Sequence, residues 1–272
     1  MSESSLKRWA DAGKITVSRT EGGHRRIPIA EAVRFIRASG ATVVRPELLG
    51  LADVKAAQDI ADDDLLFHHL HEGNGRAARG VLLGRYLGGE SVAALGDGPI
   101  RGAMTRLGEL WQHAPEGVFI EHRATDCCIQ AISALRQMIE PPEDGPVAVG
   151  GAPAGDPYII PSLLAATTLA AEGMRPVNLG PETPVASLRH AIAAHDPAMV
   201  WLSCSSPPSD DVVHGAVELA RELRARERML VVGGREKEPV VAAARAAYPV
   251  NTLAELAAFA RGVVTAHAAL GA

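Results

Sequence analysis

The sequence predicts a multidomain protein of the α and α/β classes: a winged helix-turn-helix head, a four-helix bundle and a doubly wound five-stranded parallel sheet. Three observations predict it. Two short basic segments flank a glycine turn near the N-terminus, apolar residues then recur at helical spacing, and apolar strand-like runs finally alternate with helical runs. We therefore divide the chain into residues 1–42, 46–140 and 145–272.

Length and composition set the outer limits. A chain of 272 residues with 47% hydrophobic residues is long enough for two or three domains with real cores. No apolar run approaches a membrane span, and the N-terminus lacks the apolar core of a signal peptide. Three cysteines form no disulfide framework. We therefore expect a cytoplasmic protein without a membrane partner.

The head is predicted from capping and turn residues. A helix runs from Ser5 to Gly13, where glycine ends it. The segment 15–19 can form a strand, Gly22-Gly23 gives a tight turn, and the chain returns through 24–27. Pro28 then opens a helix that continues through Arg37.

Charge is distributed unevenly along the chain. Residues 1–40 contain eight Lys and Arg against four Asp and Glu, a net charge of +4, whereas the whole chain has −5 and the remainder therefore −9. A basic head on an acidic body indicates a polyanionic partner for the head, although a solvated basic surface would show the same charge.

The composite of Leu6-Lys7-Arg8-Trp9 and Arg19-Thr20-x-Gly22-Gly23-His24-Arg25-Arg26 resembles the DNA-binding heads of MerR-type and excisionase-like regulators. The resemblance implies double-stranded DNA as partner, with Lys7 and Arg8 near the major groove. The wing would hold the backbone or a minor-groove edge through Arg19, His24, Arg25 and Arg26. Such heads begin with one more helix than this sequence shows, so either the true start lies upstream or the head is truncated.

The middle segment is predicted to be helical throughout, with Asp62, Asn74 and Ser91 as N-terminal caps and Gly and Pro at the breaks. A lead-in helix precedes four bundle helices. The five ranges are Leu48–Ile60, Asp62–Glu72, Asn74–Leu87, Ser91–Trp111 and Ile120–Met138.

Nine residues separate Trp111 from the pair Glu121-His122. This spacing resembles the helical cap of cobalamin-dependent photoreceptor repressors of the MerR type. The resemblance implies that Trp111 covers the upper face of a cobalamin, that Glu121 contacts it, and that His122 ligates cobalt, or iron in another tetrapyrrole, from above. Alternatively Trp111 is a core residue, and two adjacent helix residues point about 100° apart and need not share a site.

From Pro146 onward five strands and their helices alternate, which predicts the doubly wound sheet with ligands at the strands' carboxyl ends. The strands are Val147–Gly151, Arg175–Leu179, Met199–Cys204, Met229–Gly233 and Tyr248–Asn251. The helices are Ser162–Glu172, Val185–His195, Asp210–Arg226, Pro239–Ala247 and Leu253–Leu270.

Asp156-Pro157-Tyr158-Ile159-Ile160-Pro161 resembles the Asp-x-His-x-x-Gly loop of cobalamin-binding domains, whose His binds cobalt from below. Here Tyr158 replaces the His and Pro161 the Gly. A neutral phenol is a poor ligand for cobalt, although phenolate binds ferric haem. The alternatives are cobalamin bound base-on, cobalamin bound base-off without a protein ligand below, ligation from above, another tetrapyrrole, or an empty cleft.

Two later motifs extend the resemblance. Ser203-Cys204-Ser205 stands at the place of the family's Ser-x-Leu or Ser-x-Thr motif, and Gly233-Gly234 follows the fourth strand. In that family the nucleotide tail of the cofactor lies between the sheet and its final helices. The resemblance implies that Ser203 and Ser205 contact the displaced base and that the glycines admit the tail to the backbone. Ordinary strand-to-helix turns also use such glycines.

Together these resemblances predict a DNA-binding regulator, not an enzyme. Cobalamin, such as adenosylcobalamin, or another tetrapyrrole would control its DNA affinity or its assembly into a homo-oligomer, a dimer or tetramer, with a response to light. One alternative is a corrinoid methyl-carrier or enzyme subunit. Another is a cofactor-free regulator that retains the scaffold. No nucleophile and base are placed together in the sequence in a way that suggests catalysis.

Overall fold

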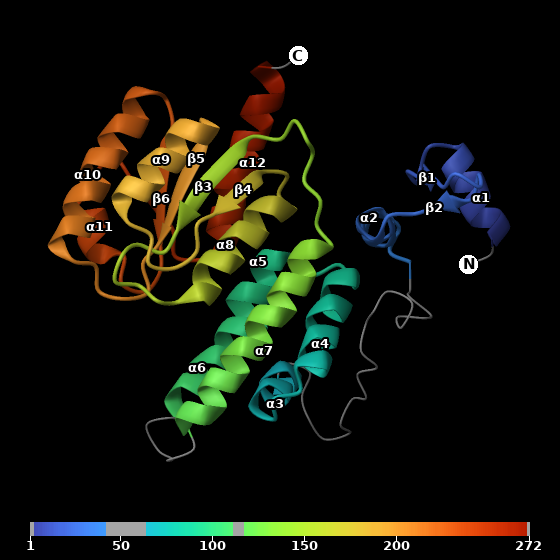
Figure 1. Cartoon of the computed structure of the whole chain (residues 1–272), viewed down its shortest axis with the longest axis horizontal. Helices are drawn as coiled ribbons and strands as arrows, with labels where there is room; N and C mark the ends of the chain where they lie inside the picture. Colours follow the sequence, from blue (N-terminus) through green and yellow to red (C-terminus); the bar gives the residue numbers. More distant parts are fainter. Residues whose placement is uncertain (1–2, 42–63, 111–116, 271–272) are drawn as a thin grey trace.

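The structure is a computed structural model that describes residues 3–41, 64–110 and 117–270 (Figure 1). The predicted lead-in helix Leu48–Ile60 lies outside these ranges. Among the described helices, none combines the length and the apolar character needed to cross a bilayer. The small head lies beside the helical bundle, and the sheet domain lies on the bundle's other side.

The head has the predicted order of helix, hairpin and helix. It consists of α1 (Glu3–Asp11), the antiparallel strands β1 (Ser18–Arg19) and β2 (Arg25–Arg26), and α2 (Ile29–Ser39). The turn closes at Gly23, whose φ of +75° favours glycine.

The first strand is shorter than the predicted segment 15–19, because residues 15 and 16 pack against or bond to other parts of the head and do not pair in the hairpin. Ile15 is buried in the head, and the Thr16 N–H donates to the Glu31 carboxylate at 2.7 Å instead of to the hairpin. Trp9 packs on Phe35 with ring centroids 4.9 Å apart. The head therefore has a core of its own between α1 and α2, although a small one.

The bundle is built from α3 (Leu65–His71), α4 (Gly75–Leu87), α6 (Arg101–Leu110) and α7 (Gly117–Gln137). Two of the predicted N-terminal caps are confirmed, and the third, Asp62, lies outside the described residues. The side chains of Asn74 and Ser91 each accept a backbone hydrogen bond at 3.1 Å from the residue three positions on.

The predicted single helix from Ser91 is wrong in detail. The chain there forms α5 (Val92–Leu95), then a π-helical turn η3 (Gly96–Ile100), and only then α6. Pro99 lies inside that turn and has no N–H to donate, so regular α-helical bonding cannot continue through it.

The bundle and the sheet domain share a continuous core. Buried leucines of the bundle belong to one cluster with Leu164 of the sheet domain. The Asp97 carboxylate in η3 also accepts hydrogen bonds from the N–H groups of Leu253 and Ala254, at 3.0 and 2.9 Å. This carboxylate caps the first turn of the last helix from another domain, which fixes the two bodies together.

The sheet is parallel throughout, with the strand order β4-β3-β5-β6-β7. This is the predicted doubly wound, flavodoxin-like arrangement. The strands are β3 (Val147–Gly151), β4 (Arg175–Asn178), β5 (Met199–Ser203), β6 (Met229–Gly233) and β7 (Tyr248–Pro249).

Helices cover both faces of the sheet (Figure 1). The helices are α8 (Ile159–Ala171), α9 (Val185–His195), α10 (Asp210–Ala225), α11 (Glu238–Ala243) and α12 (Leu253–Leu270). α8 begins three residues before the predicted Ser162, so Pro161 is in its first turn. Proline is tolerated there because that N–H has no partner within the helix.

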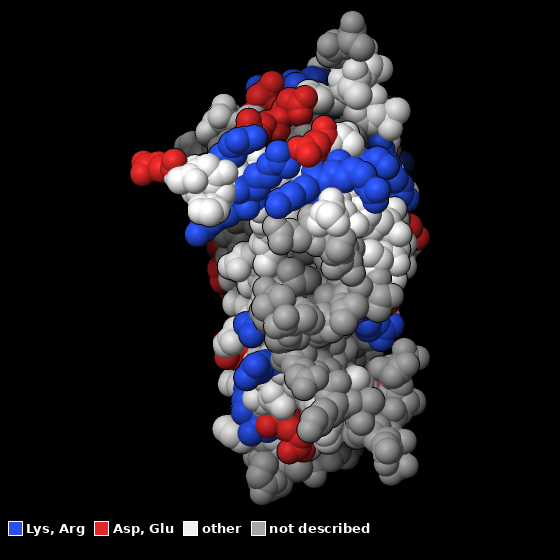
Figure 2. All heavy atoms as spheres, turned by 90° about the vertical axis from the view of Figure 1, so that its right-hand side faces the viewer, with Lys and Arg blue, Asp and Glu red and all other residues white. Residues whose placement is uncertain are grey.

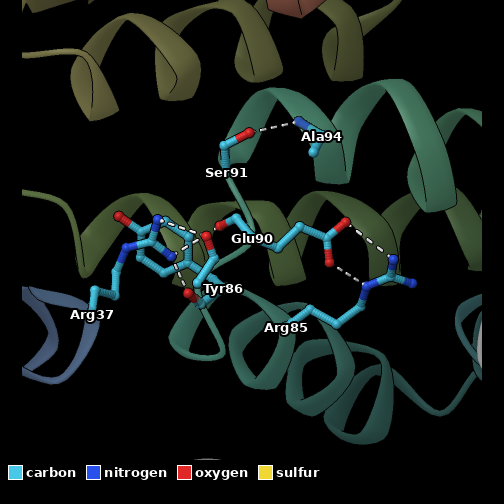
Figure 3. A network of polar contacts seen from close by, with 7 residues as sticks. Arg37, Arg85, Tyr86, Glu90, Ser91 and Ala94 are labelled. Carbon is cyan, nitrogen blue, oxygen red and sulfur yellow. Dashed lines mark hydrogen bonds and ion pairs between the residues drawn. The ribbon is translucent and has the colours of Figure 1, made fainter. Parts of the chain in front are cut away.

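Arg37 fastens the head to the bundle (Figure 3). Its guanidinium lies over the Tyr86 ring, 3.8 Å from the centroid, and donates to the carbonyl oxygens of Tyr86, Gly89 and Glu90. The Glu90 carboxylate is itself held by Arg85 at 2.6 Å. A cation thus caps the C-terminus of α4, where unpaired carbonyls and the helix dipole favour positive charge.

Candidate ligand site and basic surface

Asp156 organises the loop at the carboxyl edge of the sheet. Its side chain is 1% exposed. One carboxylate oxygen accepts from the Tyr158 N–H at 3.1 Å, and the other accepts from the N–H groups of Ser205 and Ser206 at 2.5 and 3.0 Å. Three backbone donors around one carboxylate lock the loop after β3 to the loop after β5. Asp156 therefore acts as a structural clamp in this structure.

Tyr158 occupies the position of the ligating His, and its ring is on the outside. The residue is 45% exposed, and the Arg235 guanidinium lies 5.1 Å from the ring centroid. Arg235 also donates through Nε to the Ser205 carbonyl at 2.7 Å. Arg235 and Tyr158 thus form a cation–π contact, which contributes little to stability at an exposed site.

The two glycines after β6 pack against the chain itself. A Cβ on Gly234, whose φ is +103°, would meet the Cys204 carbonyl oxygen at 2.1 Å. A Cβ on Gly233 would meet the Val250 side chain at 3.1 Å. Close approach of the Cys204 backbone therefore accounts for Gly234, and packing of the Val250 side chain accounts for Gly233, in both cases without a ligand. Ser203 and Ser205 are buried beside them.

Trp201 of β5 fills part of the space between the sheet and the helices α8 and α12. The indole is 2% exposed, and its Nε1–H points to the Ser162 hydroxyl at 3.4 Å. Trp201 belongs to the core cluster that joins the sheet to α8 and α12. A corrinoid with its nucleotide tail inserted between the sheet and the final helices would need this volume. The residues present do not fit that group.

The predicted upper-face residues are only partly visible. Trp111 lies outside the described residues. Glu121 and His122, both on α7, do come together, with His122 Nε2 3.6 Å from the Glu121 carboxylate, which also accepts from Thr125 at 3.1 Å. The His122 side chain is 77% exposed. Across the part of the chain that is described, no three or more His, Cys, Asp or Glu side chains gather as a metal site.

The six residues predicted to bind DNA are all exposed on the head. Figure 2, which views the molecule from the head side, shows Lys and Arg side chains in a broad band across that face, with acidic groups beside it. Arg25 pairs with Asp11 at 2.7 Å, on an exposed surface. The predicted residues are Lys7 and Arg8 on α1, and Arg19, His24, Arg25 and Arg26 on the hairpin.

Sequence reasoning missed four residues that shape the carboxyl edge. Arg235 and Ser206 follow recognised motifs by one residue each, so inspection of the motif ends could have found them. Trp201 and Ser162 gave no such signal, because the first sits within an apolar strand and the second within a helix.

No family model matches the chain, and no curated protein matches it in sequence. Among solved structures, the monomethylamine corrinoid protein of Methanosarcina barkeri is 18% identical with a TM-score of 0.55, covering 74% of this chain and 98% of that one. The likeness extends through the bundle and sheet arrangement and shows the fold alone: a helical domain with a five-stranded parallel sheet, as in corrinoid proteins.

Two further structures have lower scores. A cobalamin-binding protein from Desulfitobacterium hafniense is 18% identical, with a TM-score of 0.39 over 75% of this chain and 100% of its own. The methanol:cobalamin methyltransferase complex of Methanosarcina barkeri is 16% identical, with a TM-score of 0.38 over 97% and 93%. We base no argument on either.

Proposed function

We propose that the chain is a DNA-binding regulator in which a basic head is carried by a scaffold of the corrinoid-protein fold. The observation that supports it is the exposed basic surface on a helix, hairpin and helix, within a chain whose other residues are net acidic. Basic side chains on a small head suit the phosphate backbone of duplex DNA, which provides most of the affinity of such contacts.

A single head of this size offers few phosphate contacts, so its affinity as a monomer is expected to be low. Linking several heads on one body multiplies weak contacts through effective concentration. We therefore also propose that the functional form is a homo-oligomer, a dimer or tetramer. Control by a bound cofactor and by light remain predictions from the resemblance and form no part of this proposal.

The test is fluorescence anisotropy with duplex DNA over a range of salt concentrations. Removing Arg19 and Arg26 together should weaken binding and lower the salt slope by about 2, since each phosphate contact contributes about 0.9. The matched control removes two exposed arginines of α10, Arg221 and Arg224. Equal losses from both double variants would mean that the head makes no special contribution, and would contradict the proposal.

The second candidate is a corrinoid methyl-carrier subunit, favoured by the fold shared with the monomethylamine corrinoid protein. Two observations weigh against it: an exposed Tyr158 replaces the lower His, and Trp201 fills the slot. A carrier must retain a corrinoid in a one-to-one ratio and pass its methyl group to a partner enzyme. Retention of hydroxocobalamin together with methyl transfer from the loaded protein would establish this function instead.

A further inference from the structure

Trp201 is the largest of the fully buried side chains in the described parts of the molecule. Its neighbours in β5, Val200 and Leu202, point to the face that α9 and α10 cover, because side chains alternate along a strand. Trp201 points to the other face, toward α8 and α12. Among the buried residues described for that cluster, Trp201 is the one aromatic side chain, and the others are Ala, Val, Leu and Met.

The adjacent strand is shaped to receive this indole. Gly150 of β3 is the register partner of Trp201. A Cβ on Gly150 would lie 2.2 Å from Trp201 Cδ2, well inside any real contact distance. On the helix side the layer contains Ala165 and Ala166 of α8, whose short side chains leave width for a flat ring. Glycine and alanine on both sides therefore make a narrow slot one ring thick.

A short polar relay satisfies the edge of the indole. Trp201 Nε1–H donates to the Ser162 hydroxyl at 3.4 Å, and that hydroxyl donates to Asn178 Oδ1 at 2.7 Å. The same oxygen of Asn178 accepts the Gly180 N–H at 3.1 Å. Ser162 is fully buried. The relay leaves the indole nitrogen paired at the carboxyl edge of the sheet, where a buried donor without a partner would be costly.

Indole and benzimidazole are both a six-membered aromatic ring fused to a five-membered one, with nearly the same size and with nitrogen on the five-membered ring. We propose that Trp201 is a built-in plug: its indole occupies the slot that would receive the benzimidazole base of a cobalamin tail, so the domain excludes tail-inserted cobalamin. It follows that removing the indole should leave a slot for a free bicyclic aromatic base. The inference concerns the sheet domain and does not depend on DNA binding by the head.

The first experiment uses the wild-type protein. It is incubated with hydroxocobalamin and, separately, with cobinamide, a corrinoid without the nucleotide tail, and each sample is passed through gel filtration. We expect hydroxocobalamin not to be retained in a base-off form. Retention of base-off hydroxocobalamin in a one-to-one ratio would overturn the proposal, whatever happens with cobinamide, because a displaced tail would then have found room.

The second experiment opens the slot with Trp201→Gly. An apolar cavity of this kind can bind an aromatic molecule of matching shape. Saturating 5,6-dimethylbenzimidazole or indole should raise the thermal midpoint of Trp201→Gly by roughly 5 °C or more, through preferential binding to the folded state. The matched control is Leu202→Ala, which leaves a cavity on the opposite face of the same strand and should show no such shift.

The outcomes are separable. A shift confined to Trp201→Gly supports the plug. An equal shift in wild type or in Leu202→Ala, or no shift in a folded Trp201→Gly, contradicts it. Should Trp201→Gly fail to fold alone, refolding is repeated with and without indole; recovery of native circular dichroism only with indole supports the plug, and the wild-type corrinoid experiment decides independently. If the wild-type protein does not bind DNA, the proposed function is contradicted, but the inference about Trp201 is not affected.

Discussion

Two charged side chains, Asp156 and Arg37, each bind several backbone groups, but in different surroundings. Asp156 accepts three backbone N–H groups and is 1% exposed. Arg37 donates to three backbone carbonyls, but at a half-buried junction between the head and the bundle. Both satisfy backbone groups that a loop or helix end leaves unpaired. The first lies in the interior of one domain, whereas the second joins the head to the bundle, beside Val33 and Ile36 of α2, which pack on the bundle core.

The strongest way to test this comparison is Asp156→Ala. It leaves the N–H groups of Tyr158, Ser205 and Ser206 without their acceptor in a buried loop, so the free energy of unfolding should fall by roughly 3 kcal/mol or more. Chemical denaturation followed by circular dichroism measures the loss. Asp156→Asn is the matched control, because its amide oxygen can still accept two of the three bonds and it should lose less. Equal stability of Asp156→Ala and wild type would refute the clamp.

Arg37→Ala should have a smaller effect on stability, about 1–2 kcal/mol, because its hydrogen bonds are partly open to water. Its larger consequence should be positional: the head should leave α4, and the radius of gyration from small-angle scattering should increase. Arg37→Lys should recover this only in part, since an ammonium cannot stack on Tyr86 and reach several carbonyls together.

Arg34→Ala provides the control on the same helix. Arg34 is exposed, and its side chain bonds to Glu31 and to the Lys14 carbonyl within the head. A compact Arg34→Ala and an expanded Arg37→Ala would confirm that the junction depends on Arg37. Expansion in both would show that the integrity of the head, and not its docking, had been lost.

How far the sequence predicts this molecule depends on how local the signal is. Asn74 and Ser91 bond three residues away, so their caps were predicted correctly. The strand Val147–Gly151 was predicted to the residue, because a short apolar run between turn signals has few alternatives. The helical pattern from Ser91 gives no sign of the π-helical turn in which Pro99 lies, because the apolar spacing continues through it.

The candidate site shows the limit of this reasoning. Asp156 and Tyr158 were found through a local motif, but what they touch lies about fifty residues away, as in the bonds from Ser205 and Ser206 to Asp156. The sequence predicts Trp201 only as one residue of a buried strand. Its role depends on contacts with Gly150 in the neighbouring strand and with Ser162 in a helix. The periodicity of a single segment cannot predict contacts between segments. The Arg37 junction likewise joins positions 49 and 53 residues apart.

The buried thiol beside Asp156 offers a weaker, pH-dependent test. Burial, with the Asp156 charge as a second cause, raises the pKa of Cys204 from 9.0 to about 12. The thiol therefore ionises in the unfolded chain first, and its contribution to stability is full below pH 9 and is lost as the pH rises toward 12. In wild type, ionisation of this thiol should lower the free energy of unfolding by about 1 kcal/mol between pH 8 and pH 10, and Cys204→Ala should abolish that part of the decrease. Denaturation at pH 8 and pH 10, compared with wild type, measures the difference; identical slopes would contradict it.

The smallest structural effect is expected at the Arg25–Asp11 pair on the head. Exposed ion pairs contribute little to folding, so Arg25→Ala and Asp11→Ala should each leave the free energy of unfolding within about 0.5 kcal/mol of wild type. Their effects on DNA should nevertheless be opposite. Arg25→Ala removes a cation from the basic surface and should lower both affinity and salt slope, whereas Asp11→Ala removes a repelling anion and frees Arg25, which should raise affinity. Anisotropy titrations at two salt concentrations measure this, and changes of the same sign in both variants would mean that the pair lies outside the DNA-binding surface.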